Sequence, residues 1–475
     1  MKSIILICLC SSWVSLWSQS EKLYHEILSD PCFAHATIGM LVVDLTSGKE
    51  VIEFNSDLAL PPASLLKVFT TWVGLKVLGS QFQFETELGY QGNIVDGVLS
   101  GDLIVRGYGD PTVGSRYLSI AEFDKFLTRV VESVRESNIR VIEGNILGDG
   151  HSLSRLAAGS SWPYKDLANY YGAGAFGLNA HDNLFYIRFK QARPGMPTKI
   201  ESIYPEVPGL TVENFVSAGP EGSGDEAYVF GSPFQESIMI YGTIPPGSRT
   251  FTIKGALPDP AKFMASQLKT RLISSEIAVG GEAKSIYVKP AGAFNVIATF
   301  KSPPLLEVSR ITNQHSVNLY AEAIGKYLEL RLAEERAHEP VLQYFSRSEG
   351  IDISGCRFTD YSGLAPDNAV TSRSMVDLLR QIHADRESYR LIESTMSVAG
   401  VSGTMRNMLR GTKAAGNIKA KSGLIEASRN YAGYIKSENG REYAFCVLTY
   451  NANCARQVLL SKLEDLLESM YLSLE

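Results

Sequence analysis

The chain carries a β-hairpin pattern near each of its ends, and these two hairpins constrain its fold more than any other feature. Near the start, the β-rich runs Gly39–Leu45 and Glu50–Phe54 flank a polar turn. Near the end, Tyr431–Lys436 and Glu442–Tyr450 flank a second turn. The last stretch, Ala455–Leu474, places leucines at helical spacing opposite an acidic face. We therefore expect a helix packed on a sheet at this end of the chain.

The middle of the chain, roughly residues 80–290, has a different texture. Short strand-like runs such as Leu103–Arg106 and Asn145–Leu147 alternate with glycine-rich turns. The Gly-Tyr-Gly at 107–109 is followed by Pro111 and by no helix pattern, so we interpret it as a turn and not as a phosphate loop. A length of 475 residues is consistent with about three domains.

Composition excludes several classes of protein. With 45% apolar and 20% charged residues, the chain is globular and is neither disordered nor collagenous. It has 45 Lys and Arg against 51 Asp and Glu, a net charge of −6 without a basic block, so we expect no nucleic-acid partner. The seven histidines are scattered and form no H-E-x-x-H motif, so we expect no metal and no cofactor.

The first twenty residues, Met1–Ser20, have the pattern of a secretory signal peptide. Lys2 precedes an apolar run, Ile4–Trp17, that is too short and too often interrupted by serines to span a bilayer of about 30 Å. An uncleaved anchor is the alternative for this segment. Since no later segment reaches the length of a membrane span, we expect a secreted, periplasmic protein without a transmembrane segment after cleavage.

Four cysteines remain beyond this segment: Cys32, Cys356, Cys446 and Cys454. They form no C-x-x-C pair and have no zinc spacing, so we expect buried free thiols. An oxidising compartment would allow one disulfide, and the sequence leaves its pair open.

Ser64 and Lys67 stand just after Pro61-Pro62, where a helix pattern begins. Residues three apart share one helix face, which suits a nucleophile and its general base, and a helix N-terminus favours negative charge on the serine oxygen. To act as a base at neutral pH, Lys67 must have its pKa lowered from about 10.4 to near 7, a cost of about 4 kcal/mol. Burial and a second nearby cation would supply this. Alone, S-x-x-K is a very common pattern.

Two further short motifs complete a set. Lys421-Ser422-Gly423 precedes the last hairpin, where an edge strand would bring an ammonium and a hydroxyl into a cleft and glycine would allow a substrate backbone to approach. Ser316 and Asn318 can present a hydroxyl and an amide to the same cleft. Taken singly, these are a solvated strand end and a helix cap.

Together and in this order, the three motifs resemble the S-x-x-K, S-D-N and K-T-G signature of penicillin-binding proteins and β-lactamases. Ser64 and Ser316 are 252 positions apart (316 − 64), far more than in ordinary β-lactamases. This interval is similar to that of the class C penicillin-binding proteins, the penicillin-binding protein 4-type D-alanyl-D-alanine carboxypeptidase/endopeptidases. Three more stretches resemble boxes of this family: Asp360–Leu364, Val398–Arg406 and Arg106–Thr112.

The resemblance implies a role for each motif residue. Ser64 would be the acylated nucleophile and Lys67 its general base. Ser316 would pass a proton to the departing D-alanine, Asn318 would position the substrate amide, and Lys421 would bind the terminal carboxylate. The remaining substrate-binding positions are Ser422, Gly423 and Leu424, where the backbone N–H groups of Ser64 and Leu424 would form the oxyanion hole.

Within the long interval, Asp166 and Tyr171 are candidates for a pocket that takes the free end of the peptidoglycan side chain. A carboxylate suits the ammonium of a diamino acid; a surface loop with a core aromatic is the alternative. Some family members have an arginine shortly after the S-G-L box, where this chain has Pro366, so no arginine role is carried over.

The resemblance implies an α+β fold with a β-lactamase/transpeptidase-like three-layer catalytic domain, helices around an antiparallel sheet, and a large β-rich insertion. We expect the catalytic domain in residues 21–80 and 290–475 and the inserted domains in 81–289. The expected activity is that of a serine D-Ala-D-Ala carboxypeptidase, with or without endopeptidase activity, on peptidoglycan stem peptides, with β-lactam antibiotics as covalent inhibitors. The alternatives are a serine β-lactamase and a catalytically inactive cell-wall binding protein.

Overall fold

The computed structural model describes residues 29–119, 121–336 and 338–474, so the predicted signal peptide, Met1–Ser20, lies outside the described residues. The described chain forms two compact units and passes between them more than once. The first unit comprises the described residues up to Ser80, then Ser309–Val317 and the chain from Leu332 onward. The second comprises Gln81–Val308 and Asn318–Arg331.

A six-stranded antiparallel sheet forms the centre of the first unit. Its order is β16 (Ser397–Val398), β17 (Ile418–Ile425), β18 (Ser428–Lys436), β19 (Glu442–Tyr450), β1 (Thr37–Asp44) and β2 (Glu50–Phe54). Both predicted hairpins are confirmed, as β1–β2 and β18–β19. The strand β1 also pairs with β19 along its whole length, so the two ends of the chain share one sheet.

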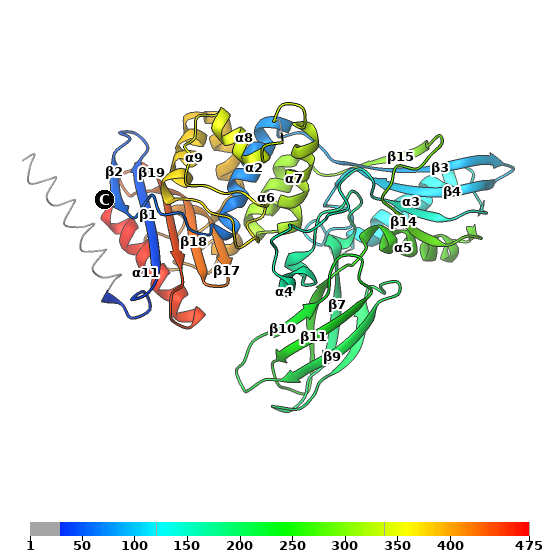
Figure 1. The fold of residues 1–475 in the computed structure, drawn as a ribbon, viewed down its shortest axis with the longest axis horizontal. Helices are drawn as coiled ribbons and strands as arrows, with labels where there is room; N and C mark the ends of the chain where they lie inside the picture. Colours follow the sequence, from blue (N-terminus) through cyan, green and yellow to red (C-terminus); the bar gives the residue numbers. More distant parts are fainter. Residues whose placement is uncertain (1–28, 120, 337, 475) are drawn as a thin grey trace, which may run out of the picture. The chain divides into compact units, whose positions relative to one another are not determined.

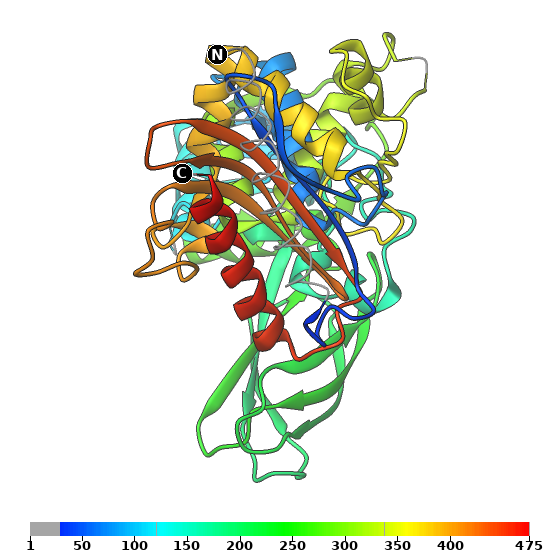
Figure 2. The same ribbon diagram turned by 90° about the vertical axis from the view of Figure 1, so that its left-hand side faces the viewer.

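Helices cover both faces of this sheet (Figures 1 and 2). On one face lies α11 (Arg456–Ser473), the predicted final helix, whose Leu463, Leu467 and Met470 join the core formed with the strands. On the other face, α9 (Ser372–Ala384) contacts β1, β18 and β19. The helices α2 (Leu66–Leu78), α8 (Val341–Ser348) and α10 (Arg386–Thr395) pack in this second helical layer. This is the predicted three-layer α+β arrangement.

The helix α2 is buried over most of its length, because its sequence is apolar on nearly every side. Ten consecutive residues, Leu66–Leu75, are buried, and the helix ends at Gly79, whose φ of 85° few other residues adopt. Lys67 is among the buried residues. An amine on this helix is therefore removed from bulk water.

The second unit is rich in strands, as predicted. Its largest sheet contains β3 (Glu85–Val95), β4 (Val98–Gly107), β5 (Val141–Ile142), β6 (Ile146–Asp149), β13 (Ala278–Val279), β14 (Ala283–Ile286) and β15 (Asn295–Lys301). One three-stranded sheet has the order β10 (Glu226–Phe230), β11 (Ser237–Ile244), β9 (Thr211–Ala218), and another has the order β12 (Thr250–Ala256), β7 (Leu184–Lys190), β8 (Lys199–Tyr204). The helices are α3 (Glu122–Glu136), α4 (Tyr164–Leu167), α5 (Pro260–Ser274) and α7 (Asn318–Arg331), while α6 (Leu305–His315) runs across the boundary at Ser309.

The end of the inserted unit differs from the predicted boundary at residues 289 and 290. The strand β15 pairs antiparallel with β3, so residues 295–301 are hydrogen-bonded into the second unit. This unit continues to Val308 and also takes in α7. The boundary depends on the pairing of strands from distant segments. The glycine-rich, strand-like pattern of the middle of the chain does not predict such pairing.

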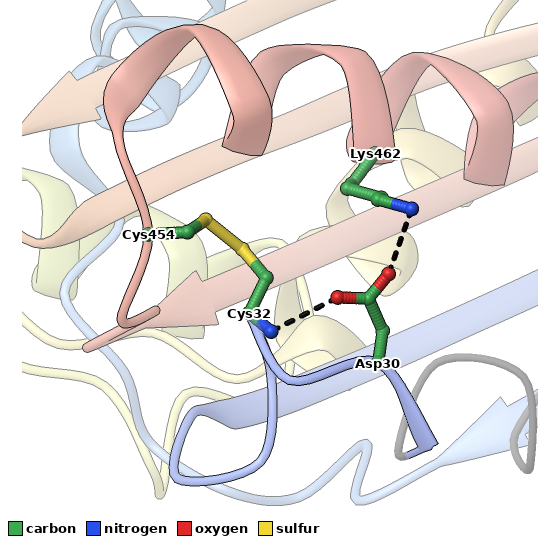
Figure 3. Close-up of a disulfide and its surroundings, with 4 residues drawn as sticks. All are labelled: Asp30, Cys32, Cys454 and Lys462. Carbon is green, nitrogen blue, oxygen red and sulfur yellow. Dashed lines mark hydrogen bonds and ion pairs between the residues drawn. A yellow bond between two sulfur atoms is a disulfide. The ribbon is translucent and has the colours of Figure 1, made fainter.

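One disulfide joins the beginning and the end of the first unit (Figure 3). Cys32 and Cys454 are bonded, with their Cα atoms 5.0 Å apart, while Cys356 and Cys446 are free thiols. Beside the bond, Lys462 forms an ion pair of 2.8 Å with Asp30, whose carboxylate also accepts the Cys32 N–H. The expectation of four free thiols is thus wrong for one pair, because the segment before β1 and the segment before α11 meet in space although they are distant in sequence.

Candidate active site

Ser64 and Lys67 lie where a short 3-10 turn, Ala63–Leu65, leads into α2. The Nζ atom of Lys67 is 2.8 Å from the Oγ atom of Ser64, and it donates a second hydrogen bond of 2.6 Å to the carbonyl oxygen of Ser362. Ala63 has a φ of 49°, a left-handed conformation that costs an L-residue about 1–2 kcal/mol. The turn that presents Ser64 is therefore held in place by its surroundings.

A second hydroxyl–amine pair lies in the same unit. The Nζ atom of Lys421, on β17, is 2.9 Å from the Oγ atom of Ser316 and donates a hydrogen bond of 2.6 Å to the carbonyl oxygen of Ser422. In the described sheet, β16 pairs with β17 only at Lys419 and Ala420. From Lys421 onward, β17 therefore has no strand on that side and forms the edge of the sheet, as predicted. Ser316 itself has a φ of 57°, again a left-handed residue at a candidate catalytic position.

The charge of Lys421 is strongly influenced by its environment. The side chain is fully buried, and burial is the main reason why the pKa of its amine lies well below the usual value. The positive charges of Lys67 and Arg429 lower this pKa further. The two buried lysines thus disfavour each other's protonation, and an incoming carboxylate would favour the charged form of Lys421.

Two glycines approach the turn that presents Ser64. A Cβ atom on Gly423 would lie 2.7 Å from the Pro62 carbonyl oxygen, and one on Gly363 would lie 1.8 Å from the Ala63 carbonyl oxygen. Asp360 fixes the second approach, because its carboxylate accepts hydrogen bonds of 2.8 and 2.7 Å from the backbone N–H groups of Gly363 and Ala365. The Asp360–Leu364 box thereby positions the backbone around the candidate nucleophile.

Three functional groups of this site were not predicted from the sequence. The Oγ1 atom of Thr404 accepts a 2.7 Å hydrogen bond from Ser422, the Ser362 carbonyl accepts from Lys67, and Arg429 acts on the charge of Lys421. Thr404 and Ser362 lie in sequence boxes that resemble those of the family. The boxes indicate that these two segments belong to the site, but they do not predict which atoms form hydrogen bonds. No comparable signal marks Arg429.

The remaining predicted residues divide between the two units. Leu424 lies on β17 with an exposed side chain. Its predicted role uses only the backbone N–H group, which does not require the side chain to be buried. In the second unit, the Tyr171 hydroxyl donates to the buried carboxylate of Asp166 at 2.9 Å, and the Asn318 side chain donates to the Tyr171 carbonyl at 2.7 Å. Burial, and then the charge of Asp166, raises the pKa of Tyr171, so its phenol stays protonated and donates. Asp166, Tyr171 and Asn318 thus form one connected group.

The described ranges contain neither a cluster of metal-binding side chains nor a helix that could span a membrane. Within residues 29–119, 121–336 and 338–474, no three His, Cys, Asp or Glu side chains are grouped so that they could hold a metal ion. In the same ranges, none of the helices combines the length and the apolar character needed to cross a membrane.

Comparisons with known proteins agree with one another. The model of the D-Ala-D-Ala carboxypeptidase 3 (S13) family matches residues 20–465. The D-alanyl-D-alanine carboxypeptidase of Actinomadura sp. (strain R39) is 27% identical over 445 residues, which cover 89% of this chain and 79% of that protein. The crystal structure of penicillin binding protein 4 (dacB) from Haemophilus influenzae has a TM-score of 0.78 at 22% identity and covers 92% of this chain and 96% of its own. The same protein complexed with a novel beta-lactam has a TM-score of 0.72 at 20% identity, with the same coverage.

Proposed function

Because the chain belongs to the D-Ala-D-Ala carboxypeptidase 3 (S13) family, we propose that it is a serine D-Ala-D-Ala carboxypeptidase that acts on peptidoglycan stem peptides. The observation that carries the proposal is the meeting of two hydroxyl–amine pairs in one unit, Ser64 with Lys67 and Ser316 with Lys421. Nucleophilic catalysis by serine needs a base within hydrogen-bond distance, and a neighbouring positive charge helps to keep a lysine base neutral.

In the proposed acylation step, the Ser64 oxygen attacks the carbonyl carbon of the penultimate D-alanine while Lys67 takes the hydroxyl proton. The peptide bond breaks, Ser316 passes its proton to the departing amine and regains one from the protonated Lys67, and free D-alanine leaves. Water then hydrolyses the ester on Ser64 and releases the shortened peptide. The contact between Lys67 and the Ser362 carbonyl supports the role as base, because it holds the amine beside Ser64.

Substrate recognition is assigned to groups around β17. Lys421 binds the terminal carboxylate, Ser422 adds a hydrogen bond, and Gly423 allows the peptide backbone to approach. The N–H groups of Ser64 and Leu424 stabilise the oxyanion, and loss of one such donor typically lowers the rate about 10²–10³-fold. In this structure the Ser422 hydroxyl donates to Thr404, so it must turn away from Thr404 to donate to the substrate carboxylate.

The group formed by Asp166, Tyr171 and Asn318 is assigned to the rest of the stem peptide. Asn318 would position the substrate amide, and Asp166 would receive an ammonium at the free end of the side chain. The hydrogen bond from Asn318 to the Tyr171 carbonyl supports a joint role, because it ties the motif residue to the pocket candidates.

The proposal extends to inhibitors, to location and to a second activity. β-Lactams would acylate Ser64, in keeping with the β-lactam complex of the H. influenzae relative. A signal peptide at Met1–Ser20 would send the chain to the periplasm, where its substrate lies. Cleavage of peptide cross-links would use the same acylation chemistry on a longer leaving group.

The test is a product analysis with a soluble peptide that ends in D-Ala-D-Ala and with a coloured cephalosporin. We expect the wild type to release one D-alanine per peptide and Ser64→Ala to release none. Rapid turnover of the cephalosporin without D-alanine release would favour a β-lactamase instead. Absence of both reactions, together with absence of covalent labelling by penicillin, would favour an inactive binding protein.

A further inference from the structure

A large open cavity lies within the second unit, and none of the candidate catalytic or substrate-binding residues lines it. Its volume is about 930 Å³, near the upper end of ordinary small-molecule sites. Four parts of the chain line it: the start of β3, the turns that follow β4 and β6, and the last turn of α7. The proposed reaction uses none of these residues.

One wall of the cavity is aromatic. Phe82 and Tyr327 line it with their ring centroids 4.9 Å apart, and Phe84 packs behind both at 5.1 and 5.4 Å. These mutual contacts fix the planes of the rings. Rings that are held in this way and half exposed offer a flat surface on which an apolar face of a ligand can stack.

The other walls carry hydrogen-bond acceptors. Glu85 and Glu87 alternate on β3 and so share one face of the strand. The Nδ1 atom of His151 is 2.7 Å from the buried carboxylate of Asp149, which accepts the Nδ1 proton, and in this tautomer of imidazole Nε2 is the acceptor. Arg106 offsets the charge of Asp149 through a 2.7 Å ion pair.

Both carboxylates of the cavity already accept from a neighbouring group, which is a cation for Glu85 and a neutral hydroxyl for Glu87. Glu85 is 3.2 Å from the Lys301 ammonium, and Glu87 accepts a 2.7 Å hydrogen bond from the Tyr108 hydroxyl. Arg331 adds a cation to the lining. A ligand that is itself a cation would therefore gain little, whereas a neutral ligand with many hydroxyl donors can use the remaining acceptor positions.

We propose that this cavity is a binding site for a neutral saccharide, whose apolar ring face stacks on Tyr327 and whose hydroxyls donate to Glu85, Glu87 and His151. Aromatic rings match the apolar C–H face of a sugar ring, and carboxylate acceptors match the hydroxyls around its edge. Its use during the reaction, where it would hold the glycan part of a cell-wall substrate, rests on the proposed function. Sugar binding itself does not.

The test titrates the full chain with the neutral sugar N,N′,N″-triacetylchitotriose and follows binding by calorimetry. Tyr327→Phe keeps the ring and should bind as the wild type does, whereas Tyr327→Leu should weaken binding about tenfold, the value of one good aromatic contact. Glu87→Gln should weaken it about fivefold through loss of a charged acceptor. The control is Tyr241→Leu, an exposed tyrosine that stacks on Phe215 elsewhere in the unit and should change nothing.

Three results would overturn the proposal. The first is no binding by the wild type, and the second is binding as strong as that of the wild type in both Tyr327→Leu and Glu87→Gln. The third is loss of binding in Tyr241→Leu alone. Stronger binding of the diamine cadaverine than of the sugar would show a cation site instead and would also overturn it. If Tyr327→Leu does not fold, the affinity of Glu87→Gln for the sugar is the test, and unchanged affinity would overturn the proposal.

Labelling of Ser64 by penicillin in the same variants separates this proposal from the proposed function. We expect unchanged labelling together with weakened sugar binding. A chain that binds the sugar but is never labelled would support the cavity and contradict the function.

Discussion

The amine of Lys67 lies between the Ser64 hydroxyl and the Ser362 carbonyl, and this position assigns it the role of base. Replacing it by alanine leaves no group to take the proton from Ser64. Loss of a general base typically lowers a rate about 10²–10⁴-fold. We therefore expect Lys67→Ala to reduce the rate of penicillin acylation to this extent while the denaturant midpoint stays near that of the wild type.

Lys76→Ala is the matched control, since Lys76 lies on the same helix in a partly exposed ion pair of 3.3 Å with Asp385. It should leave acylation unchanged. Normal acylation of Lys67→Ala would show that another group is the base.

Lys421 makes substrate binding depend on pH. Burial, Lys67 and Arg429 together lower its pKa well below the usual value, so its positive charge is lost at a lower pH than that of an exposed lysine. We expect the KM of a peptide with a free terminal carboxylate to rise as the pH increases through this lowered pKa. The same peptide with a C-terminal amide should lack this rise.

Arg429→Gln removes one of the positive charges and should shift the rise in KM toward higher pH. An unshifted profile would mean that Lys421 does not bind the carboxylate. Because folded Lys421 binds its proton less tightly than unfolded lysine does, its contribution to stability increases with pH between its lowered pKa and about 10.4.

At the scale of elements, the turn that begins α2 depends on two glycines beside it. Gly363 has a φ of 80°, and a Cβ atom there would lie 1.8 Å from the Ala63 carbonyl oxygen. We expect Gly363→Ala to lower the free energy of unfolding by about 3 kcal/mol or more and to slow acylation, because the backbone around Ser64 must move. Urea denaturation and penicillin labelling measure the two effects.

Gly416 gives a matched control just before β17. It has the same φ of 80°, but a Cβ atom there would meet no atom within 4 Å. Gly416→Ala should therefore cost only about 1 kcal/mol for the left-handed backbone and leave acylation unchanged. Equal effects of the two substitutions would show that the approach of Gly363 to the turn is unimportant.

At the scale of the whole molecule, the Cys32–Cys454 disulfide joins positions 422 residues apart. A bond that closes so long a loop restricts the unfolded chain strongly, and removal of a native disulfide typically costs about 2–5 kcal/mol. We expect Cys32→Ser/Cys454→Ser to lower the urea midpoint of the first unit. A reducing agent should lower the midpoint of the wild type and leave that of the double variant as it is.

Cys356→Ser, which removes a free thiol, should keep the wild type's sensitivity to the reducing agent. If the double variant is as stable as the wild type, the disulfide does not restrain this unit.

The sequence predicted those features that are local or that belong to a spaced motif. The two hairpins, the final helix and the pairs around Ser64 and Lys421 follow from short-range patterns and from the order of three boxes. The contact of Thr404 with Ser422, the pairing of β15 with β3 and the partner of Cys32 join segments far apart in the chain. Such pairings depend on the packed fold, and a single sequence contains no signal that specifies them.

Acylation of Ser64 by a substrate analogue can be observed by mass spectrometry of the penicillin-treated chain. After digestion, we expect a mass increase equal to one penicillin on the peptide that contains Ser64, with none in Ser64→Ala. A penicillin adduct on any other residue, or an adduct that persists in Ser64→Ala, would contradict the assignment of Ser64 as the acylated nucleophile.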